Sequence, residues 1–373
     1  MNVIVPHGFE TNYTTGFATG LAASGVEFVV VSCDADDHVL AGRGIRTANL
    51  RGSVSEDRPA LAKAGNLALY YLRLLRFLVA HRQCTVHFTG IFRNELLLVE
   101  GVMLPALFGL LSKRYVYTAH NVLPHGKAGS RLHRWVYRWI YRWPDTIVVN
   151  TALAGEQIAE RFGVARERIR VSSIGFNDEV PATGLGRLDA RARLGLAPDA
   201  KVLLFFGKIS RYKGLDLLVD AHERLEQPGV RLVIAGSFTD DECRARIHAQ
   251  IAASRCRDRI ALHERHVPNE EIEVFFAAAD ALVLPYREIS QSGLIFLAMR
   301  FGVPVVATAV GSLKAWLEPD MGLVARTNDA AGIAAAIDEF LRAPGRFDGE
   351  RIIAKGREYR WDNVCRALRP LYD

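Results

Sequence analysis

The chain has 373 residues, of which 50% are hydrophobic and 24% are charged. This length exceeds one compact core and predicts two domains, and the hydrophobic share excludes a disordered chain. The formal net charge of +6 is unevenly placed, because residues 51–150 hold 14 Lys and Arg against five Asp and Glu, whereas residues 151–373 hold 31 of each kind. A local excess of this kind bears on binding partners rather than on the fold.

Cysteine usage and the N-terminus indicate the compartment. Five cysteines are scattered along the chain without a CxxC pair, which favours a reducing environment over a zinc site or a disulfide framework. The N-terminus lacks a basic segment followed by an apolar one, and no apolar run reaches the ~18 residues of a spanning helix. We therefore expect a cytoplasmic protein whose membrane contact, if any, is peripheral on the inner face of the cytoplasmic membrane.

The first half of the chain alternates short apolar segments with longer helical patterns. The apolar segments predict strands at Val3–Val5, Glu27–Ser32, Thr85–Phe88, Tyr115–Thr118, Thr146–Asn150 and Ile169–Ser172. The segments between them predict helices at Thr14–Ser24, Ala60–His81, Asn94–Leu111, Ser130–Trp143 and Ala152–Phe162. Residues 177–200 are rich in Gly and Pro, so they are expected to link two domains and to end in a short helix.

The alternation then restarts. Strands are predicted at Val202–Phe206, Arg231–Ala235, Ile260–His263, Ala281–Leu284 and Val305–Ala307. Helices are predicted at Gly214–Leu225, Asp240–Ser254, Asn269–Ala278, Gly293–Phe301 and Ala330–Arg342, with a last helix near residues 357–371. No G-x-G-x-x-G motif follows a first strand, which disfavours a dinucleotide oxidoreductase.

This order predicts an α/β protein made of two Rossmann-like, doubly wound domains. We expect residues 1–178 to form an N-terminal acceptor-binding domain and residues 179–356 a C-terminal donor-binding domain. Residues 357–373 are expected to cross back to the first domain as a helix. Ligands of such sheets bind outside the carboxyl ends of the strands, so the natural site is a cleft that the two domains face.

Two segments of the second half carry the chemistry. The loop Gly207–Gly214 leaves a buried strand, contains three cations and enters a helix, which suits a phosphate or a diphosphate. The second segment runs from Asp280 through Pro285 to a helix that begins near Ser292 and Gly293, whose free N–H groups suit the same ligand. An isolated segment of either kind is more often a solvated basic loop or an ordinary serine cap.

Taken in order, these segments resemble the donor-binding half of GT-B glycosyltransferases, in particular glycosyltransferase family 4 (group 1). The resemblance also rests on the segments 269–285 (NEEIEVFFAAADALVLP) and 298–308 (AMRFGVPVVAT). It implies a GT-B fold and a hexosyltransferase that uses a UDP- or GDP-sugar as substrate and a lipid-linked or polysaccharide acceptor. The implied reaction is retaining and needs no metal or other cofactor.

The resemblance also implies roles for single residues. Lys208 and Lys213 would offset the charge of the diphosphate, together with Ser292, Gly293 and Leu294 at the start of the helix. The loop after the strand Ile260–His263 would touch the nucleotide base through its backbone. The residues expected to contact the nucleotide or the sugar are Gly207, Arg211, His266, Val267, Glu288 and Gln291. His263, Glu264 and His266 have a metal-like spacing, but such a run more often is a loop after a strand.

One family feature is missing. The family usually carries two glutamates in an E-x7-E pattern, and these positions are Ile289 and Leu297 in this chain. Neither side chain accepts a hydrogen bond, so the contact with the donor ribose is absent or supplied elsewhere, and Glu288 is a shifted candidate. The departure leaves three alternatives: an inverting GT-B transferase with a GDP-mannose type of donor, a sugar-nucleotide epimerase, and an inactive nucleotide-sugar binding protein.

Candidate catalytic residues lie in the first half. His120 follows the strand Tyr115–Thr118 and resembles the histidine that family members place beside the donor sugar, where it would donate to a hydroxyl or act as a base. The alternative is that His120 has a purely structural role. Glu10, in the first loop, is the alternative base for an inverting enzyme, and His125 is a weaker companion of His120.

The densest basic segment is residues 130–143, SRLHRWVYRWIYRW. Its cations recur at helical spacing between aromatic residues, a pattern that suits a helix lying on an anionic membrane surface. The residues expected there, or at the acceptor, are Arg131, Arg134, Trp135, Arg138, Trp139 and Arg142. The alternative is a core helix whose aromatic residues pack inward while the arginines are solvated. Nucleic-acid binding is not expected, because no reader module accompanies the charge.

Overall fold

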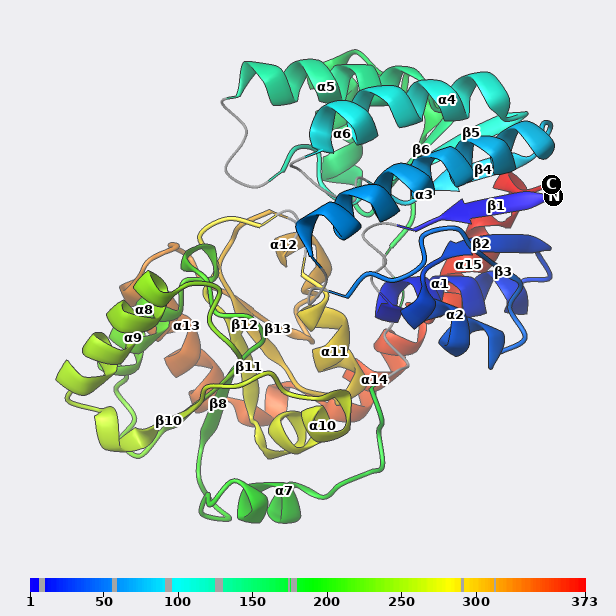
Figure 1. Cartoon of the computed structure of the whole chain (residues 1–373). Coiled ribbons are helices and arrows are strands. Elements are labelled where there is room, and N and C mark those ends of the chain that lie inside the picture. The colour runs from blue at the N-terminus through cyan, green and yellow to red at the C-terminus, as the bar shows by residue number, and fades with distance from the viewer. Residues whose placement is uncertain are drawn as a thin grey trace. The chain divides into compact units, whose positions relative to one another are not determined.

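The computed structural model describes residues 1–6, 11–55, 59–90, 96–124, 130–173, 175, 180–289, 292–311 and 313–373. The chain forms two compact units, which consist of residues 1–177 with 359–373 and of residues 178–358. Each unit has its own parallel sheet with helices on both faces (Figure 1). The prediction of two doubly wound α/β units is confirmed.

The first unit, called unit 1, is built on seven parallel strands in the order β3-β2-β1-β4-β5-β6-β7. The order reverses between β1 and β4. The strands are β1 (Asn2–Val5), β2 (Phe28–Ser32), β3 (Thr47–Asn49), β4 (Thr85–Phe88), β5 (Arg114–Ala119), β6 (Thr146–Val149) and β7 (Ile169–Val171). The helices are α1 (Thr11–Ala23), α2 (Asp34–Ala41), α3 (Ala60–Ala80), α4 (Leu104–Leu111), α5 (Arg131–Arg142), α6 (Ala152–Phe162) and α15 (Trp361–Leu368).

Alternate residues of these strands enter two different cores. Val3 and Val5 of β1 join the core that α3, α4, α5 and α6 cover, whereas Ile4 joins the core under α1, α2 and α15. The same alternation occurs in β5, where Tyr115 and Val116 lie in opposite cores. Because side chains of a strand alternate with period two, a run that is apolar at every position must be buried on both faces.

The second unit, called unit 2, has six parallel strands in the order β10-β9-β8-β11-β12-β13, which reverses between β8 and β11. The strands are β8 (Val202–Phe206), β9 (Arg231–Ala235), β10 (Ile260–His263), β11 (Ala281–Leu284), β12 (Val305–Ala307) and β13 (Gly322–Val324). The helices are α7 (Arg187–Arg193), α8 (Leu215–His222), α9 (Asp241–Ala253), α10 (Asn269–Ala278), α11 (Leu294–Arg300), α12 (Leu313–Trp316), α13 (Ala330–Arg342) and α14 (Gly349–Arg357).

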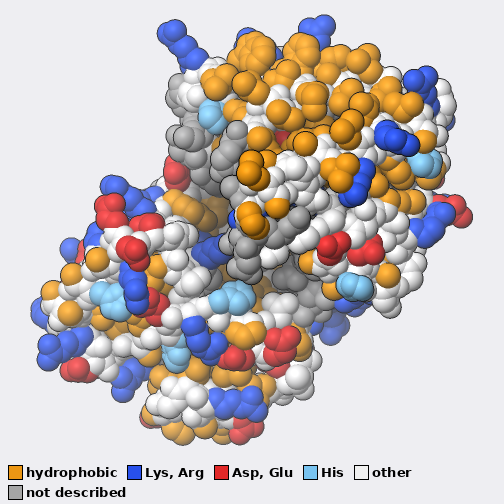
Figure 2. Space-filling view, in the orientation of Figure 1, with side chains coloured by type: hydrophobic (Ala, Val, Ile, Leu, Met, Phe, Trp, Pro, Cys, Tyr) orange, Lys and Arg blue, Asp and Glu red, His pale blue; other side chains and the backbone are white. Residues whose placement is uncertain are grey.

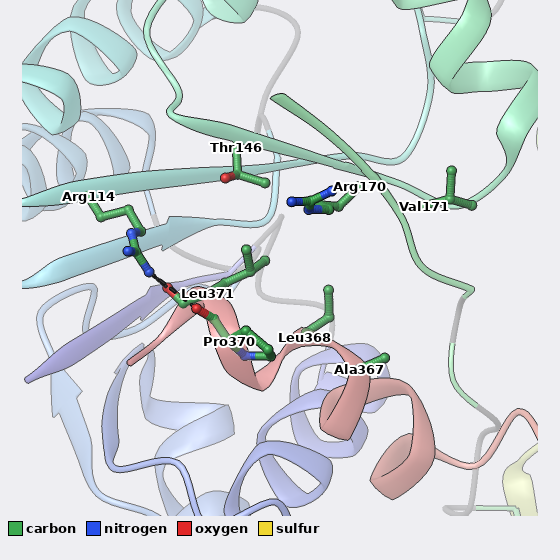
Figure 3. Close-up of a pocket in the computed structure, with 8 residues that line it drawn as sticks. All are labelled: Arg114, Thr146, Arg170, Val171, Ala367, Leu368, Pro370 and Leu371. Carbon is green, nitrogen blue, oxygen red and sulfur yellow. Dashed lines mark hydrogen bonds between the residues drawn. The ribbon is translucent and has the colours of Figure 1, made fainter. Parts of the chain in front are cut away.

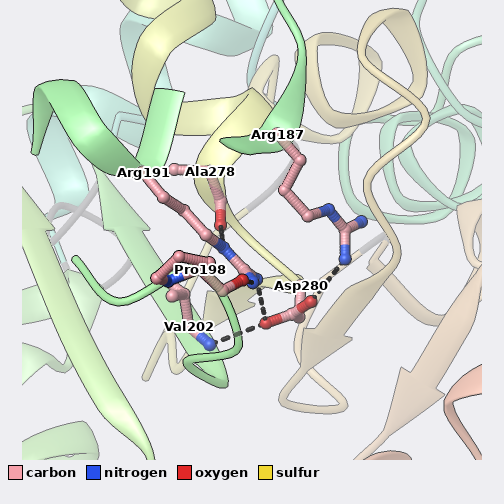
Figure 4. Close-up of polar contacts among 6 residues, drawn as sticks. All are labelled: Arg187, Arg191, Pro198, Val202, Ala278 and Asp280. Carbon is pink, nitrogen blue, oxygen red and sulfur yellow. Dashed lines mark hydrogen bonds and ion pairs between the residues drawn. The ribbon is translucent and has the colours of Figure 1, made fainter. Parts of the chain in front are cut away.

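Asp280 organises the amino ends of the central strands of unit 2. Its carboxylate accepts hydrogen bonds from the backbone N–H of Val202 at 2.7 Å and from the guanidinium of Arg191 at 2.8 Å (Figure 4). Arg187 adds a third contact at 2.7 Å. Arg191 is almost fully buried, and its remaining N–H groups donate to the carbonyls of Ala278 and Pro198. This network fastens α7 to the sheet at the edge opposite the loops of the candidate site.

The end of the chain packs into unit 1. Trp361 of α15 lies against Gly16 of α1 so closely that a Cβ at Gly16 would overlap the indole ring. At Gly20 a Cβ would lie 2.5 Å from the carbonyl oxygen of Trp361. Figure 1 shows α15 beside α1, with the two chain ends close together. The glycines therefore let the two helices approach, and residues 359–373 belong to this unit.

Several elements differ from the sequence expectation. The segment 34–49 forms α2 and β3, which the pattern did not predict because α2 begins with three aspartates among its first four residues and β3 is a three-residue edge strand. The helix expected over Asn94–Leu111 contains a π-helical turn, Val99–Met103, in which the N–H of Leu104 donates to the carbonyl of Val99. Pro105 follows this turn and has no N–H to continue a regular ladder.

Candidate active site

The loops that follow β8 and β11 pack against each other at the carboxyl edge of the sheet of unit 2. The backbone N–H of Arg287 donates to the carbonyl of Tyr212 at 2.8 Å, and the Arg287 guanidinium donates to the carbonyl of Arg211 at 3.0 Å. Gly214 has a φ of +68°, and a Cβ there would overlap the carbonyl oxygen of Pro285. The strand order reverses at this point, which is where open α/β sheets bind ligands.

Lys213 carries its ammonium group into this contact. The residue is only 9% exposed, and Nζ lies 5.9 Å from the centre of the Tyr286 ring. A Cβ on Gly207 would lie 3.1 Å from the same Nζ. Among the described residues Lys213 has neither a carboxylate partner nor a hydrogen-bond acceptor. Burial and the charge of Lys208 lower the pKa of Lys213 from 10.5 to about 8. A buried cation without a counter-charge is suited to an anionic ligand.

An ion pair holds the two loops in register. The Arg287 guanidinium donates to both carboxylate oxygens of Asp216, each at 2.7 Å. Burial opposes ionisation of Asp216, but the hydrogen bonds and the charge of Arg287 outweigh it and hold the pKa of this carboxyl below its usual value. The Oγ of Ser210, in the same loop as Lys213, is buried without a hydrogen-bond partner among the described residues. The loop therefore offers a buried cation and a buried hydroxyl on a fixed backbone.

The start of α11 lies against the same tyrosine. The hydroxyl of Ser292 is buried and lies 3.3 Å from the Tyr286 hydroxyl, and the N–H of Leu294 donates weakly to Ser292 Oγ at 3.4 Å. Beyond its own neighbours in the chain, no described atom lies within 4 Å of the position that a Cβ would take at Gly293. Gln291 lies outside the described residues. The structure thus brings Ser292 beside the aromatic ring that Lys213 contacts.

The remaining residues expected around the donor differ in exposure. Lys208, Arg211, Glu288 and His266 are exposed, and Val267 is buried. Ile289 and Leu297, at the positions of the missing glutamates, are half-buried. Tyr286 and Arg287 were not foreseen as site residues. The sequence pointed to them only by position: they follow the carboxyl end of β11, and β11 is one of the two strands between which the strand order reverses.

The metal-like run after β10 has other partners. Glu264 accepts from Arg244 at 2.5 Å and from His248 at 2.6 Å. Among the residues that the structure describes, no group of three His, Cys, Asp or Glu side chains could hold a metal ion. Glu264 therefore links α9 to the loop after β10.

In unit 1, His120 follows β5 at the carboxyl edge of the sheet. The residue is half-buried, and its ring lies edge-on to Tyr13, with 4.9 Å between the ring centres. Tyr13 also stands edge-on to Trp361 at 5.2 Å, so the C-terminal helix buttresses the aromatic neighbour of His120. Glu10 and His125 lie outside the described residues. The position of His120 at a strand end suits contact with a ligand.

A second histidine, His87 of β4, lies in the core beside this region. Its Nδ1 is 2.5 Å from the Tyr372 hydroxyl, and its Nε2 is 2.7 Å from Thr118 Oγ1. Burial, followed by the charge of His120, lowers the pKa of His87 to about 3. His87 is therefore neutral at physiological pH and has no nitrogen left for a substrate, so its role is to fasten the C-terminal segment to the sheet.

Helix α5 separates its cations from its aromatic rings. Arg131, Arg134, Arg138 and Arg142 are exposed, and none forms an ion pair with a described residue. Of its tryptophans, Trp135 is exposed, whereas Trp139 is half-buried and donates its indole N–H to the carbonyl of Val102 at 2.9 Å. The arginines thus face solvent while much of the aromatic side packs inward.

A pocket of about 470 Å³ lies at the other edge of the sheet of unit 1 (Figure 3). Arg114 and Thr146 line it from the first residues of β5 and β6, opposite the strand ends that lead to His120. The Arg114 guanidinium donates to the carbonyls of Leu371 at 3.0 Å and Pro370 at 3.3 Å. Arg114 thus stabilises the last turn of the chain. Because the pocket lies at the amino ends of β5 and β6, it is not part of the candidate site.

Solved structures of similar fold cover almost the whole chain. The HepE protein of Anabaena, solved in complex with UDP-glucose, matches 98% of this chain and 97% of its own, with a TM-score of 0.73 and 16% identity. Sucrose-phosphate synthase of Thermosynechococcus elongatus matches 99% of this chain and 97% of its own, with a TM-score of 0.74 and 20% identity. Two parallel α/β units of seven and six strands make this a GT-B fold.

Sequence models match both halves of the chain. The model of the glycosyl transferases group 1 matches residues 200–343, and that of glycosyltransferase family 4 matches residues 11–180. The chain belongs to glycosyltransferase family 4, group 1, as the resemblance of its motifs implied.

Curated relatives match the chain over part of its length. A D-inositol 3-phosphate glycosyltransferase of Xylanimonas cellulosilytica is 30% identical over 240 residues, which are 61% of this chain and 56% of the relative. Another, of Stackebrandtia nassauensis, is 34% identical over 213 residues, which are 54% of this chain and 47% of the relative. The chain spans about half the length of the curated relatives it matches.

Among the described residues, no helix is long and apolar enough to cross a membrane.

Proposed function

We propose that the protein transfers a hexosyl group from a UDP- or GDP-sugar to a lipid-linked or polysaccharide acceptor, with retention of the anomeric configuration and without a metal. The observation that carries the proposal is Lys213, a buried ammonium without a described counter-charge, at the switch in strand order of the unit that the group 1 model matches. In this assignment the donor binds on unit 2 and the acceptor on unit 1.

The diphosphate is the part of the donor that this site suits. Departure of the nucleoside diphosphate concentrates negative charge on its oxygens, and a fixed, desolvated cation stabilises that charge more than a hydrated one does. Lys213 takes this role, with exposed Lys208 as the outer cation and Ser210 and Ser292 as hydroxyl donors. The bound anion raises the depressed pKa of Lys213 and keeps the group charged.

The sugar end is assigned to His120. Its place at the end of β5 suits a hydrogen bond to a donor hydroxyl, and the edge-on ring of Tyr13 restricts its orientation. Glu10 would supply the base if the reaction inverts. UDP-glucose is the first donor to test, because the structural neighbour from Anabaena was solved with it. Inositol phosphate is the first acceptor to test, because the curated relatives carry that name.

The deciding experiment measures nucleotide release from UDP- and GDP-sugars with and without acceptor. Release that requires an acceptor supports the proposal, and the anomeric proton of the product, read by NMR, distinguishes retention from inversion. Tight binding of the donor without turnover would instead identify a nucleotide-sugar binding protein, the reading that the apolar side chain of Leu297 favours. Conversion of the donor sugar without acceptor would identify an epimerase.

A further inference from the structure

Unit 1 carries an apolar surface on the outer side of one helical layer. Nine of the fifteen exposed large hydrophobic side chains of the described residues lie between positions 61 and 135. They come from α3, from the π-helical turn with the residue before it, from α4 and from α5. They are Leu61, Leu69, Leu72, Val79, Leu98, Met103, Leu110, Leu132 and Trp135. We call this set the apolar surface.

These side chains share one side of the molecule. The buried faces of the three helices meet in one core, to which α3 contributes Leu74, α4 Phe108 and α5 Ile140. The outer faces of the helices therefore look away from the same sheet. In Figure 2 hydrophobic side chains gather over this layer, with Lys and Arg among and around them.

Two close contacts join α5 to its neighbours in this layer. A Cβ at Gly101 would lie 2.5 Å from Val136 Cγ1, and a Cβ at Gly109 would lie 2.6 Å from Trp143 Cε3. The two glycines thus let α5 approach the π-helical turn and α4 closely. Trp143 fills that contact rather than the outer face, and eight of the nine side chains of the apolar surface are aliphatic or methionine.

The charge around this surface has one sign. Between positions 59 and 144 the chain holds 12 Lys and Arg and only two acidic residues, Glu95 and Glu100. Glu100 is buried and accepts a hydrogen bond from the Tyr71 hydroxyl at 2.7 Å. Arg76 lies within the exposed face of α3, between Leu72 and Val79. The described surface of α3, α4 and α5 therefore combines exposed apolar side chains with exposed cations, and these three helices contain no Asp or Glu.

We propose that this face of unit 1, the outer side of α3, α4 and α5, binds an anionic lipid bilayer. Leucine and methionine side chains gain by entering the interfacial region of a bilayer, and each nearby cation adds attraction to acidic headgroups. A second copy of this chain would bring two cationic faces together, which opposes association. A nucleic acid would neutralise the arginines but leave the aliphatic residues against water.

The test uses the full chain and vesicles of phosphatidylcholine with 30 mol% phosphatidylglycerol, against vesicles of phosphatidylcholine alone, with no nucleotide present. We expect cosedimentation with the anionic vesicles that weakens as salt is raised. The double variant Leu72→Gln/Leu110→Gln should weaken binding at least about tenfold, because both side chains are more than half exposed and contribute only to the outer face. The matched control Leu153→Gln/Leu188→Gln changes two exposed leucines outside the apolar surface, at 48% and 64% exposure, and should bind within about twofold of the native chain.

A second pair of variants tests the charge. Arg134→Gln/Arg138→Gln should reduce binding and flatten its salt dependence, whereas Arg161→Gln/Arg193→Gln should do neither, although all four arginines are exposed. The proposal is overturned if the Leu72/Leu110 variant binds like the native chain, or if the acidic lipid makes no difference. It is also overturned if analytical ultracentrifugation shows a dimer that this variant dissociates. Because vesicle binding is measured without donor or acceptor, its outcome is independent of the proposed reaction.

Discussion

The ammonium group of Lys213 lies 5.9 Å from the centre of the Tyr286 ring, which joins the loop after β8 to the loop after β11. The two residues are far apart in the chain, and only the strand order β9-β8-β11-β12 brings them together. An aromatic face attracts a cation but does not neutralise it. The site therefore keeps a desolvated positive charge in the unliganded protein, and this charge has consequences for stability as well as for catalysis.

Lys213→Met should stabilise the unliganded protein and abolish turnover. Because burial and Lys208 lower the pKa of Lys213 to about 8, the folded state binds fewer protons than the unfolded state between about pH 8 and pH 10.5. The native chain therefore gains stability as the pH rises through that window. At pH 7 the variant should be more stable by up to about 3 kcal/mol, and at pH 10.5 the difference should nearly vanish.

Urea unfolding at pH 7 and pH 10.5 measures this difference, and nucleotide release measures the loss of catalysis, expected to be at least about 100-fold. Lys208→Met is the matched comparison, because Lys208 is exposed and is the smaller cause of the lowered pKa of Lys213, so its removal should stabilise the protein at pH 7 by less than Lys213→Met does. A variant at Lys213 that is less stable than the native chain at pH 7 would contradict the assignment of an uncompensated buried charge.

Arg287→Ala should release the loop that carries Lys213. The arginine joins Asp216 through two hydrogen bonds of 2.7 Å and also holds the carbonyl of Arg211. We expect the KM for the donor to rise at least about tenfold, with Arg287→Lys a poor replacement because lysine lacks the two-pronged geometry. As a control, Arg342→Ala removes the more exposed pair with Glu226 and should leave donor binding unaltered.

The same variant should change acid unfolding. A carboxyl whose pKa is held below its usual value contributes stability above that usual value and loses it as the pH falls through the lowered pKa. Asp216 is such a carboxyl, with Arg287 as the main group that favours its ionised form. Arg287→Ala should therefore shift the acid-unfolding midpoint to higher pH, which circular dichroism between pH 2 and pH 6 would show.

His120→Ala should slow the reaction without weakening the binding of the donor. A side chain that donates to the sugar or moves a proton typically contributes about 10²–10⁴ in rate. The diphosphate contacts on unit 2 stay intact in this variant, so the Kd of the donor in isothermal titration should stay within about threefold of the native value. A drop in kcat of less than about threefold would show that His120 has only a structural role beside Tyr13.

The sequence predicts more of this fold than of its site. Runs such as VLLFF at 202–206 are apolar at every position, which only a sheet covered on both faces explains. Segment 34–49 was missed because α2 begins with aspartates and β3 has only three residues, so neither shows a clear hydrophobic periodicity. The basic loop with Lys213 was found from its composition, but its contact with Tyr286 depends on strand order, which local patterns do not encode. Of the apolar surface, the sequence analysis named only Trp135 on α5, and the leucines of α3 and α4 were missed because a leucine looks the same in the sequence whether it faces the core or the solvent.

Trp361→Ala should destabilise unit 1 through the loss of its C-terminal helix. Trp361 is 5% exposed, and its indole stands edge-on to Tyr13 and Phe17 and lies against Gly16 and Gly175, which leave room for it. Removing a buried tryptophan from a close-packed site costs about 3–5 kcal/mol, because the surroundings collapse only in part. Trp135→Ala, which truncates an exposed tryptophan, should cost less than about 0.5 kcal/mol. Guanidinium unfolding of both variants gives the comparison, and equal costs would show that α15 is not fastened to α1 by this ring.

Since Tyr13 contacts both Trp361 and His120, the Trp361 variant should also lower kcat under conditions in which it remains folded.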